Sequence, residues 1–169
     1  AYSGYFALRL EDANGVTLAS FTDSTDPQTF TVGVTQAGTY YARVASYYSS
    51  SFYNGQYSLT ATHAAGSSAG YESESNDTRA TADAVTLGSA ITGQLTSAID
   101  VDYYAVTVES AGTVSLNFNR PNEAYSGYFA LRLEDANGVT LASFTDSTDP
   151  QTFTVGVTQA GTYYARVAS

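Results

Sequence analysis

Residues 124–169 read AYSGYFALRLEDANGVTLASFTDSTDPQTFTVGVTQAGTYYARVAS, and residues 1–46 read the same, letter for letter. Folding does not require identity at solvent-facing positions, so the simplest cause is recent duplication within a repetitive gene, with an engineered duplication as the alternative. The offset of 123 residues exceeds the roughly 50-residue limit of solenoid repeats and has the size of an ordinary domain. The sequence therefore predicts a tandem repeat of about 123 residues in which each unit buries its own core.

Apolar residues alternate with polar or small ones through most of the sequence, which is the pattern of strands that are buried on one face. Phe129, Leu131 and Leu133, for example, point one way, and the residues between them point the other. Strands are expected at residues 104–108, 114–118, 128–133, 139–141, 153–157 and 163–167, with the last strand of a unit at residues 57–61.

Turn residues separate these runs. Asn137-Gly138 favours a hairpin because both residues accept positive φ, and Ser110–Gly112 and Gln159–Gly161 separate other strands. Helix is expected only as a single turn within residues 77–84. About eight short strands at intervals of about 8–12 residues predict an all-β fold, an antiparallel β-sandwich of jelly-roll type.

The repeat also predicts how the chain divides. Residues 1–63 are expected to be the C-terminal part of one sandwich, and the small, polar residues 64–71 the linker. Residues 72–169 are expected to be the N-terminal part of the next sandwich, without the strand equivalent to residues 47–63.

The composition excludes several classes of partner. The net charge is −10, and all six basic residues are Arg, so nucleic acid and anionic lipid would be repelled. No Cys is present to form a disulfide, and no apolar run approaches the roughly 20 residues that cross a membrane. An acidic chain rich in Tyr, Ser, Thr and Gly is typical of an extracellular or cell-surface protein.

Six oxygen-bearing side chains form the most distinctive pattern. The run Glu72-Ser73-Glu74-Ser75-Asn76-Asp77 places alternate ligands on one face of an extended chain, and Asp100 and Asp102 share a face at the start of a strand. Ca²⁺ takes about six to eight oxygen ligands, so the predicted metal ligands are Glu72, Glu74, Asn76, Asp77, Asp100 and Asp102. The alternative is a solvated acidic linker. The EF-hand loop pattern is absent.

The run Glu72-x-Glu74-x-Asn76-Asp77-Thr78, followed by Ala82, Gly93 and Asp100-x-Asp102-Tyr103-Tyr104, resembles the bacterial pre-peptidase C-terminal domain. Residues 161–167 and 55–59 resemble its closing strands. The resemblance implies a β-sandwich attached to secreted peptidases, in some cases as a collagen-binding module, with calcium held by the N-terminal acidic segment. It assigns ligand roles to the same six positions. The loop 96–99 lacks the extra acidic or glycine residues that the family often has there. The number of bound ions, one or two, is therefore left open.

Catalytic chemistry finds little support in the sequence, and no catalytic residue is predicted. His63 is the single His and lies at a strand end, where a solvated side chain is the simpler interpretation. There is neither a Cys nucleophile nor a Lys for Schiff-base chemistry. Acidic pairs can act as glycosidase carboxylates, but nothing in the sequence marks a raised pKa. The chain is predicted not to be an enzyme.

Two functions follow from these observations. The leading one is a structural or adhesive repeat of a long extracellular bacterial surface protein or filament, stiffened by calcium at the linker. The alternative is a non-catalytic accessory domain of a secreted hydrolase, for substrate binding or secretion. The expected partners are neighbouring copies, joined covalently or by donation of strand 47–63 into the position after Ser169.

Aromatic residues gather at Tyr47, Tyr48, Phe52 and Tyr53, and at Tyr125 and Tyr128. Rings of this kind bind sugars or collagen-like ligands when they are exposed. The favoured interpretation is that they pack on half-buried strands with only the hydroxyl group in water.

Overall fold

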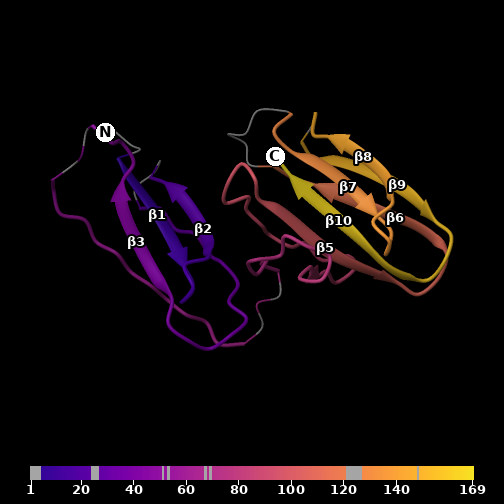
Figure 1. The fold of residues 1–169 in the computed structure, drawn as a ribbon, viewed down its shortest axis with the longest axis horizontal. Helices are drawn as coiled ribbons and strands as arrows, with labels where there is room; N and C mark the ends of the chain where they lie inside the picture. Colours follow the sequence, from indigo (N-terminus) through magenta and orange to yellow (C-terminus); the bar gives the residue numbers. More distant parts are fainter. Residues whose placement is uncertain are drawn as a thin grey trace. The chain divides into compact units, whose positions relative to one another are not determined.

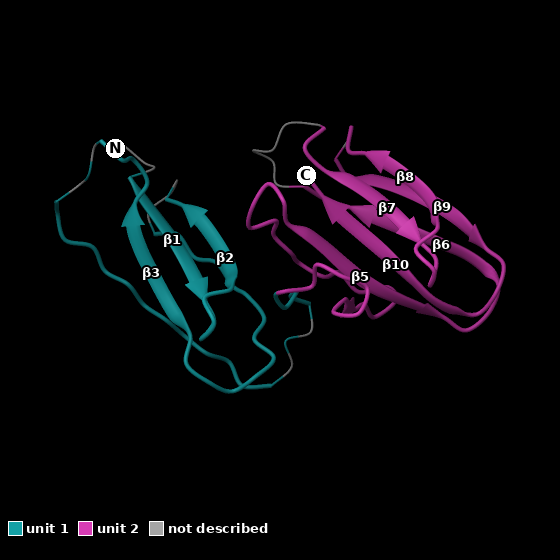
Figure 2. Ribbon diagram, viewed as in Figure 1, with its two compact units in different colours: residues 1–74 teal, residues 75–169 magenta. Residues whose placement is uncertain are grey.

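The structure is a computed structural model that describes residues 5–23, 27–50, 52, 54–66, 68, 70–120, 127–147 and 149–169. The chain forms two compact units, Ala1–Glu74 and Ser75–Ser169 (Figure 2). All regular structure in the described residues is β, so the all-β prediction is confirmed. Ser67 and Ala69 of the predicted linker lie outside the described residues. The limits predicted for the two sandwiches and the linker stay predictions.

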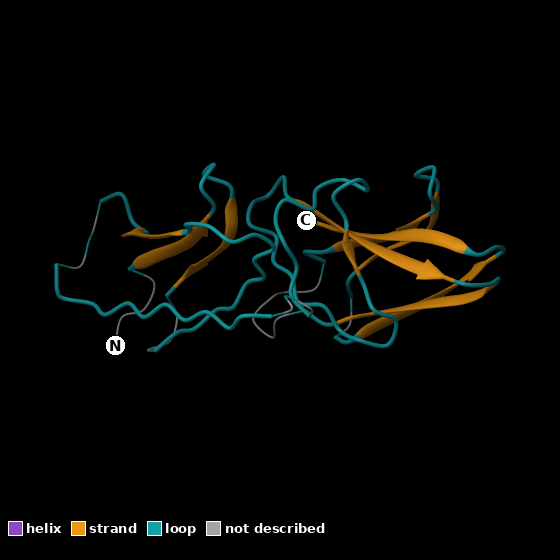
Figure 3. Ribbon diagram, turned by 90° about the horizontal axis from the view of Figure 1, so that it is seen from below, coloured by secondary structure: helices purple, strands orange, loops and turns teal. Residues whose placement is uncertain are grey.

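The described part of the second unit contains two sheets, which form two layers in Figure 3. The larger sheet has the order β4 (Asp83–Ala84), β5 (Val101–Val108), β10 (Gly161–Ala168), β7 (Ala130–Glu134) and β8 (Thr140–Thr145), and the smaller pairs β6 (Gly112–Phe118) with β9 (Gln151–Val157) (Figure 1). The pairs are antiparallel apart from β4 with β5, which is parallel. The expected fully antiparallel arrangement is therefore wrong at this edge, where a turn at Thr78–Thr81 leads into β4.

The core of this unit lies between its two sheets. Val106, Leu133 and Tyr163 from the larger sheet pack with Val114 and Val157 from the smaller sheet. The apolar residues that alternate along the strands therefore meet face to face, as in a β-sandwich. The side-chain period of two puts alternate residues of β5 and β7 into this core, as the sequence predicts.

The short connections have two different roles. Asn137-Gly138 lies in the β7–β8 hairpin, where Asp135 N donates to Val139 O and Gly138 N donates to Asp135 O. Only Gly138 of this pair has a positive φ, 85°, so the turn uses one left-handed residue where two were expected. Ser110–Gly112 and Gln159–Gly161, in contrast, each carry the chain from one sheet to the other.

The side chain of Asp135 stabilises the hairpin from within. Its Oδ1 accepts hydrogen bonds from Asn137 N at 2.9 Å and Val139 N at 2.8 Å. The bond from Val139 is the largest cause that lowers the pKa of Asp135 below its ordinary value of 3.8. Asp12, at the same position of the first copy, shows the same lowered pKa for the same reason.

The first unit repeats the local structure of the second. β1 (Phe6–Glu11), β2 (Thr17–Thr22) and β3 (Tyr41–Ser46) form a sheet with the order β2-β1-β3, which matches β8-β7-β10. The registers agree at an offset of 123 residues, and a bulge falls before the last residue of both β1 and β7. Identical sequence thus gives identical pairing in these three strands.

One repeated segment adopts two conformations. Residues 151–157 form β9, but the identical residues 28–34 form no strand. In the second unit each residue of β9 faces a residue of β6, whereas the sheets of the described structure do not include residues 28–34. A strand without a partner leaves its main-chain hydrogen bonds to water, which removes the reason for an extended ladder.

The strand predicted at residues 57–61 is also absent from the described structure, so that prediction is wrong. Tyr57 and Leu59 are exposed, although the ring of Tyr57 touches that of Phe6 edge-on. In the described structure β3 is paired with β1 on one side, whereas β10 is paired on both sides, with β5 and β7.

The two copies provide a matched test of core packing. Leu133 has no exposed surface, whereas Leu10, its equivalent in the first copy, is only partly buried. We expect Leu133→Ala to reduce the free energy of unfolding by about 2–5 kcal/mol through lost burial and a cavity. Leu10→Ala should cost clearly less. Urea unfolding of both variants measures the difference, and equal losses would contradict the assignment of the core.

Candidate metal centre

The acidic residues singled out by the sequence are mostly buried. Glu72, Asn76, Asp100 and Asp102 are all withdrawn from solvent, and Asn76 has no exposed surface at all. Buried carboxylates are rare unless they are paired, hydrogen-bonded or bound to a metal. This burial argues against a freely solvated acidic linker.

β5 positions Asp102. Its buried residues alternate, so Asp102 lies on the same face as Tyr104 and Val106 of the core. The backbone of Asp102 faces Val167 in the neighbouring strand β10. The hydroxyl group of Tyr104 donates to Asp102 Oδ2 at 3.4 Å. A carboxylate is thus fixed at the start of a strand that is hydrogen-bonded on both edges.

Asn76 ties the acidic run to the edge of the sandwich. Its main-chain oxygen accepts a hydrogen bond from Tyr103 N at 3.0 Å, next to Asp102 in β5. Its side-chain Nδ2 donates to Asp83 Oδ2 in β4 at 3.1 Å. The sequence pattern did not mark Asp83, whose role depends on the parallel pairing of β4 with β5.

Asp100 is held by the loop before β5. Its Oδ2 accepts a hydrogen bond from Thr96 Oγ1 at 2.7 Å, and its Oδ1 accepts one from Val101 N at 2.9 Å. Burial raises the pKa of Asp77, and a hydrogen bond with Asp100 and the charge of Asp100 raise it further. Two carboxyl groups in contact disfavour a second negative charge.

Three of the six predicted ligands form one group. Glu72, Glu74 and Asp102 each offer a carboxylate oxygen, and these atoms lie within 4.8 Å of one another. Ca²⁺ binds oxygen at about 2.3–2.6 Å, so two ligands of one ion lie at most about 5 Å apart. The three carboxylates therefore fit a hard cation in both spacing and chemistry, and this acidic group could hold a metal. Asp77 and Asp100 contact each other and are not members of the group.

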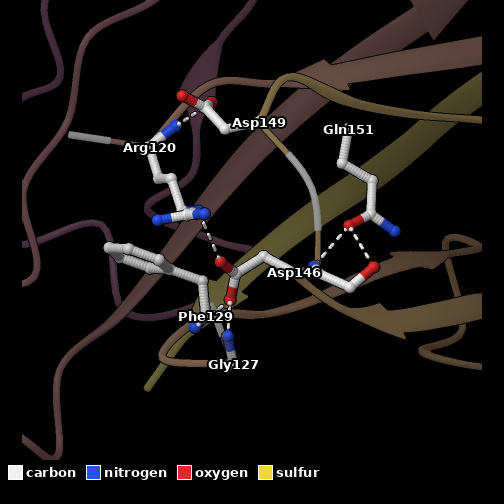
Figure 4. A network of polar contacts seen from close by, with 7 residues as sticks. Arg120, Gly127, Phe129, Asp146, Asp149 and Gln151 are labelled. Carbon is white, nitrogen blue, oxygen red and sulfur yellow. Dashed lines mark hydrogen bonds and ion pairs between the residues drawn. The ribbon is translucent and has the colours of Figure 1, made fainter. Parts of the chain in front are cut away.

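A further buried carboxylate, which sequence reasoning missed, is Asp146, directly after β8 (Figure 4). Its Oδ1 accepts hydrogen bonds from Gly127 N at 3.0 Å and Phe129 N at 2.7 Å. Its Oδ2 lies 3.1 Å from Nε of Arg120. Asp23, the same residue of the first copy, also accepts a hydrogen bond from a main-chain nitrogen, that of Phe6.

The Asp146 network closes the loop between β8 and β9. The main-chain nitrogen of Arg120 donates to Asp149 at 3.1 Å, and Gln151 Oε1 accepts from Ser147 N at 2.7 Å (Figure 4). The Arg120 guanidinium supplies the positive charge that Asp146 needs in a buried position. Asp146 is therefore a structural residue of the sandwich.

Comparison with known proteins bears on the same part of the chain. Residues 100–169 match the family model described as the bacterial pre-peptidase C-terminal domain. The match confirms the resemblance read from the sequence over β5 to β10, and the run Glu72–Asp77 precedes it. No curated protein matches the chain. No solved structure matches it either.

The family sets coarse limits on function. Pre-peptidase C-terminal domains are non-catalytic accessory domains, typically of secreted bacterial peptidases, which is consistent with an extracellular location. Over the described residues, no helix has the length and apolar character that crossing a membrane requires.

The Arg120–Asp146 pair generates a test of the network. We expect Arg120→Met to reduce the free energy of unfolding by about 3–5 kcal/mol, because it leaves Asp146 buried without its cation. Arg132→Met is the control, since Arg132 is exposed on β7, and it should change stability by at most about 0.5 kcal/mol. Chemical unfolding at neutral pH measures both, and equal effects would contradict the structural role of the pair.

Proposed function

We propose that this chain is a non-catalytic, calcium-dependent binding module of a secreted bacterial protein, and that it acts beside a hydrolase domain. The family match over residues 100–169 carries the proposal, because domains of this family accompany secreted peptidases. The acidic composition and the absence of Cys and Lys nucleophiles agree with a role in binding.

Calcium is the cation we propose for the acidic group. Carboxylate oxygens are hard ligands, and Glu72, Glu74 and Asp102 supply three of them. A bound ion would supply charge neutralisation and no reaction. Glu72 and Glu74 would hold the acidic run against β5 through Asp102. Asn76, Asp77 and Asp100 stay predicted ligands, and the number of ions stays open.

Removal of calcium should destabilise the protein. At calcium concentrations about 100-fold above the dissociation constant, binding adds about 2.7 kcal/mol to the folded state. We therefore expect a chelator to lower the melting temperature measured by calorimetry, and Asp102→Asn to abolish the difference.

Glu109→Gln is the matched control for this test. Glu109 directly follows β5 and is exposed, so its neutralisation should leave the calcium dependence intact. Melting temperatures that do not respond to the chelator in the wild-type chain would contradict the calcium proposal.

A ligand surface is proposed at the exposed aromatic residues of the first unit. Tyr47 and Tyr48 directly follow β3 with rings 5.1 Å apart and edge-to-face, and Phe52 is 75% exposed. The half-buried packing favoured from the sequence does not describe these three rings. Tyr128 is also exposed, and Tyr53 and Tyr125 lie outside the described residues. Exposed, clustered rings suit a collagen-like or other proline-rich protein ligand.

The binding proposal is tested by retention of the whole chain on insoluble collagen fibrils. We expect the wild type to be retained without releasing soluble peptides. Phe52→Ala should weaken binding about tenfold, since aromatic hot spots contribute more than about 1 kcal/mol each. Tyr128→Ala, which removes an exposed ring of the second unit, is the control. Absence of retention would contradict the ligand class, and release of peptides would contradict a non-catalytic role.

A structural repeat is the second candidate, and the identity of residues 1–46 with residues 124–169 favours it. Such identity suits an array that lengthens and shortens by recombination in an extracellular or cell-surface protein. Neighbouring copies would be the partners, with donation of strand 47–63 as one route of association. This candidate predicts the same calcium dependence but no retention on the fibrils, so the two experiments together separate the candidates.

A further inference from the structure

Two arginine side chains face each other on the outer face of the larger sheet. Arg132 in β7 and Arg166 in β10 are direct partners in the antiparallel register. Arg132 lies between the buried residues Leu131 and Leu133, so its side chain points away from the core. Opposed residues of an antiparallel pair have Cβ atoms about 4.5–5.5 Å apart and share a face of the sheet. We call Arg132 and Arg166 the arginine pair.

The arginine pair brings two like charges together without an internal counter-charge. Like charges directly opposite each other destabilise a sheet. Over the described residues, no ion pair joins either guanidinium group to a carboxylate, and the ion pairs are made by Arg79 and Arg120 instead. Arg166 lies over the ring of Tyr103 in β5, with Cζ 6.0 Å from the ring centroid, which holds the guanidinium group but does not neutralise it.

The first unit contains the equivalent pair. Arg9 in β1 faces Arg43 in β3, and both side chains are exposed. The pair of the first unit is followed by residues 47–74 of that unit, and the arginine pair is preceded by residues 75–120 of its own unit. Both pairs are accessible to solvent in the described structure, so neither segment covers them there.

We infer that the arginine pair and its equivalent bind the carboxylate groups of a polyuronate, an acidic polysaccharide with one carboxylate per sugar ring. A guanidinium group presents a planar fork of N–H donors that matches a carboxylate. A carboxylate bound between the two side chains would also remove their mutual repulsion. The inference goes beyond the proposed function and depends on neither calcium nor the exposed aromatic residues of the first unit.

The distribution of charge favours this class of ligand over other polyanions. Four of the six basic residues lie in the two pairs, while the net charge of the chain is −10, so positive charge is confined to two small sites. Nucleic acid, with a charge about every 1.7 Å, would be repelled by the surrounding acidic surface. A polyuronate is less densely charged.

The neighbouring side chain and the repeat both suit a polysaccharide. Ser143 in β8 is exposed directly opposite Arg132, so its hydroxyl group can bond a sugar hydroxyl beside the carboxylate. Ser20 is in the same position opposite Arg9 in the first unit. A polymer with repeating carboxylates can bind at both sites of one chain, which raises its affinity above that of a single uronate.

The test measures binding of the whole chain to polygalacturonate by isothermal titration calorimetry at low ionic strength with a chelator present. The chelator keeps calcium from cross-linking the polymer and makes the result independent of the calcium proposal. We expect saturable binding that weakens as sodium chloride is added, because salt screens exposed charges. Uncharged dextran should not bind.

Arg132→Gln and Arg9→Gln, singly and together, are the decisive variants. We expect each to weaken binding at least about tenfold through the loss of charge-assisted hydrogen bonds, and the double variant to abolish it. Without polysaccharide, the melting temperature should be unchanged or slightly higher, because opposed like charges are removed. Thr113→Glu is the control, since it changes the net charge by the same amount at an exposed position of β6 and should leave binding unchanged.

Three results would overturn the inference. The first is no binding of polygalacturonate to the wild type; self-association of the wild type that Arg132→Gln removes would then assign the arginine pair to carboxylates of another copy. The second is an equal loss of binding in Thr113→Glu and Arg132→Gln, which would leave only an effect of net charge. The third is a lower melting temperature of Arg132→Gln without polysaccharide, which would make the arginine pair a structural feature.

Discussion

Residues 151–157 form β9 because β6 offers a hydrogen-bonding partner along their whole length. The same seven residues at positions 28–34 form no strand in the described structure. Strand formation here is a property of the pair. The core depends on it, since Val114 and Val157 cover Val106, Leu133 and Tyr163 only when the smaller sheet exists. The two copies within one chain separate the effect of partners from the effect of sequence.

Burial of charge is the second constraint, and it is met in two ways. Asp146 is satisfied inside the protein by two main-chain NH groups and by Arg120. Glu72, Glu74 and Asp102 instead bring three carboxylates within 4.8 Å of one another, an arrangement that a divalent cation would stabilise. The sequence distinguishes these cases only in part. The alternating run Glu72–Asp77 indicates the group of three carboxylates, whereas no local pattern indicates that Asp146 is buried.

The family match concerns a single domain, whereas the repeat concerns more than one copy of a segment. Residues 100–169 match the pre-peptidase C-terminal domain, a family whose members are typically non-catalytic accessory domains of secreted bacterial peptidases. The identity of residues 1–46 with residues 124–169 is instead a feature of more than one copy. Both are consistent with the acidic, cysteine-free composition, which keeps a repetitive chain soluble without disulfides.

The sequence by itself determined the all-β class, the strands β5 to β10 to within a few residues, the family, and the acidic residues that could bind a cation. These features are local, because side-chain alternation, turn residues and short motifs each depend on residues that are close together in the sequence. Only the tertiary structure decided that residues 28–34 and 57–61 form no strand, that Asp83 binds Asn76, and that Asp146 is buried beside Arg120. Each of these depends on residues far away in the chain, whose presence or absence local patterns do not record.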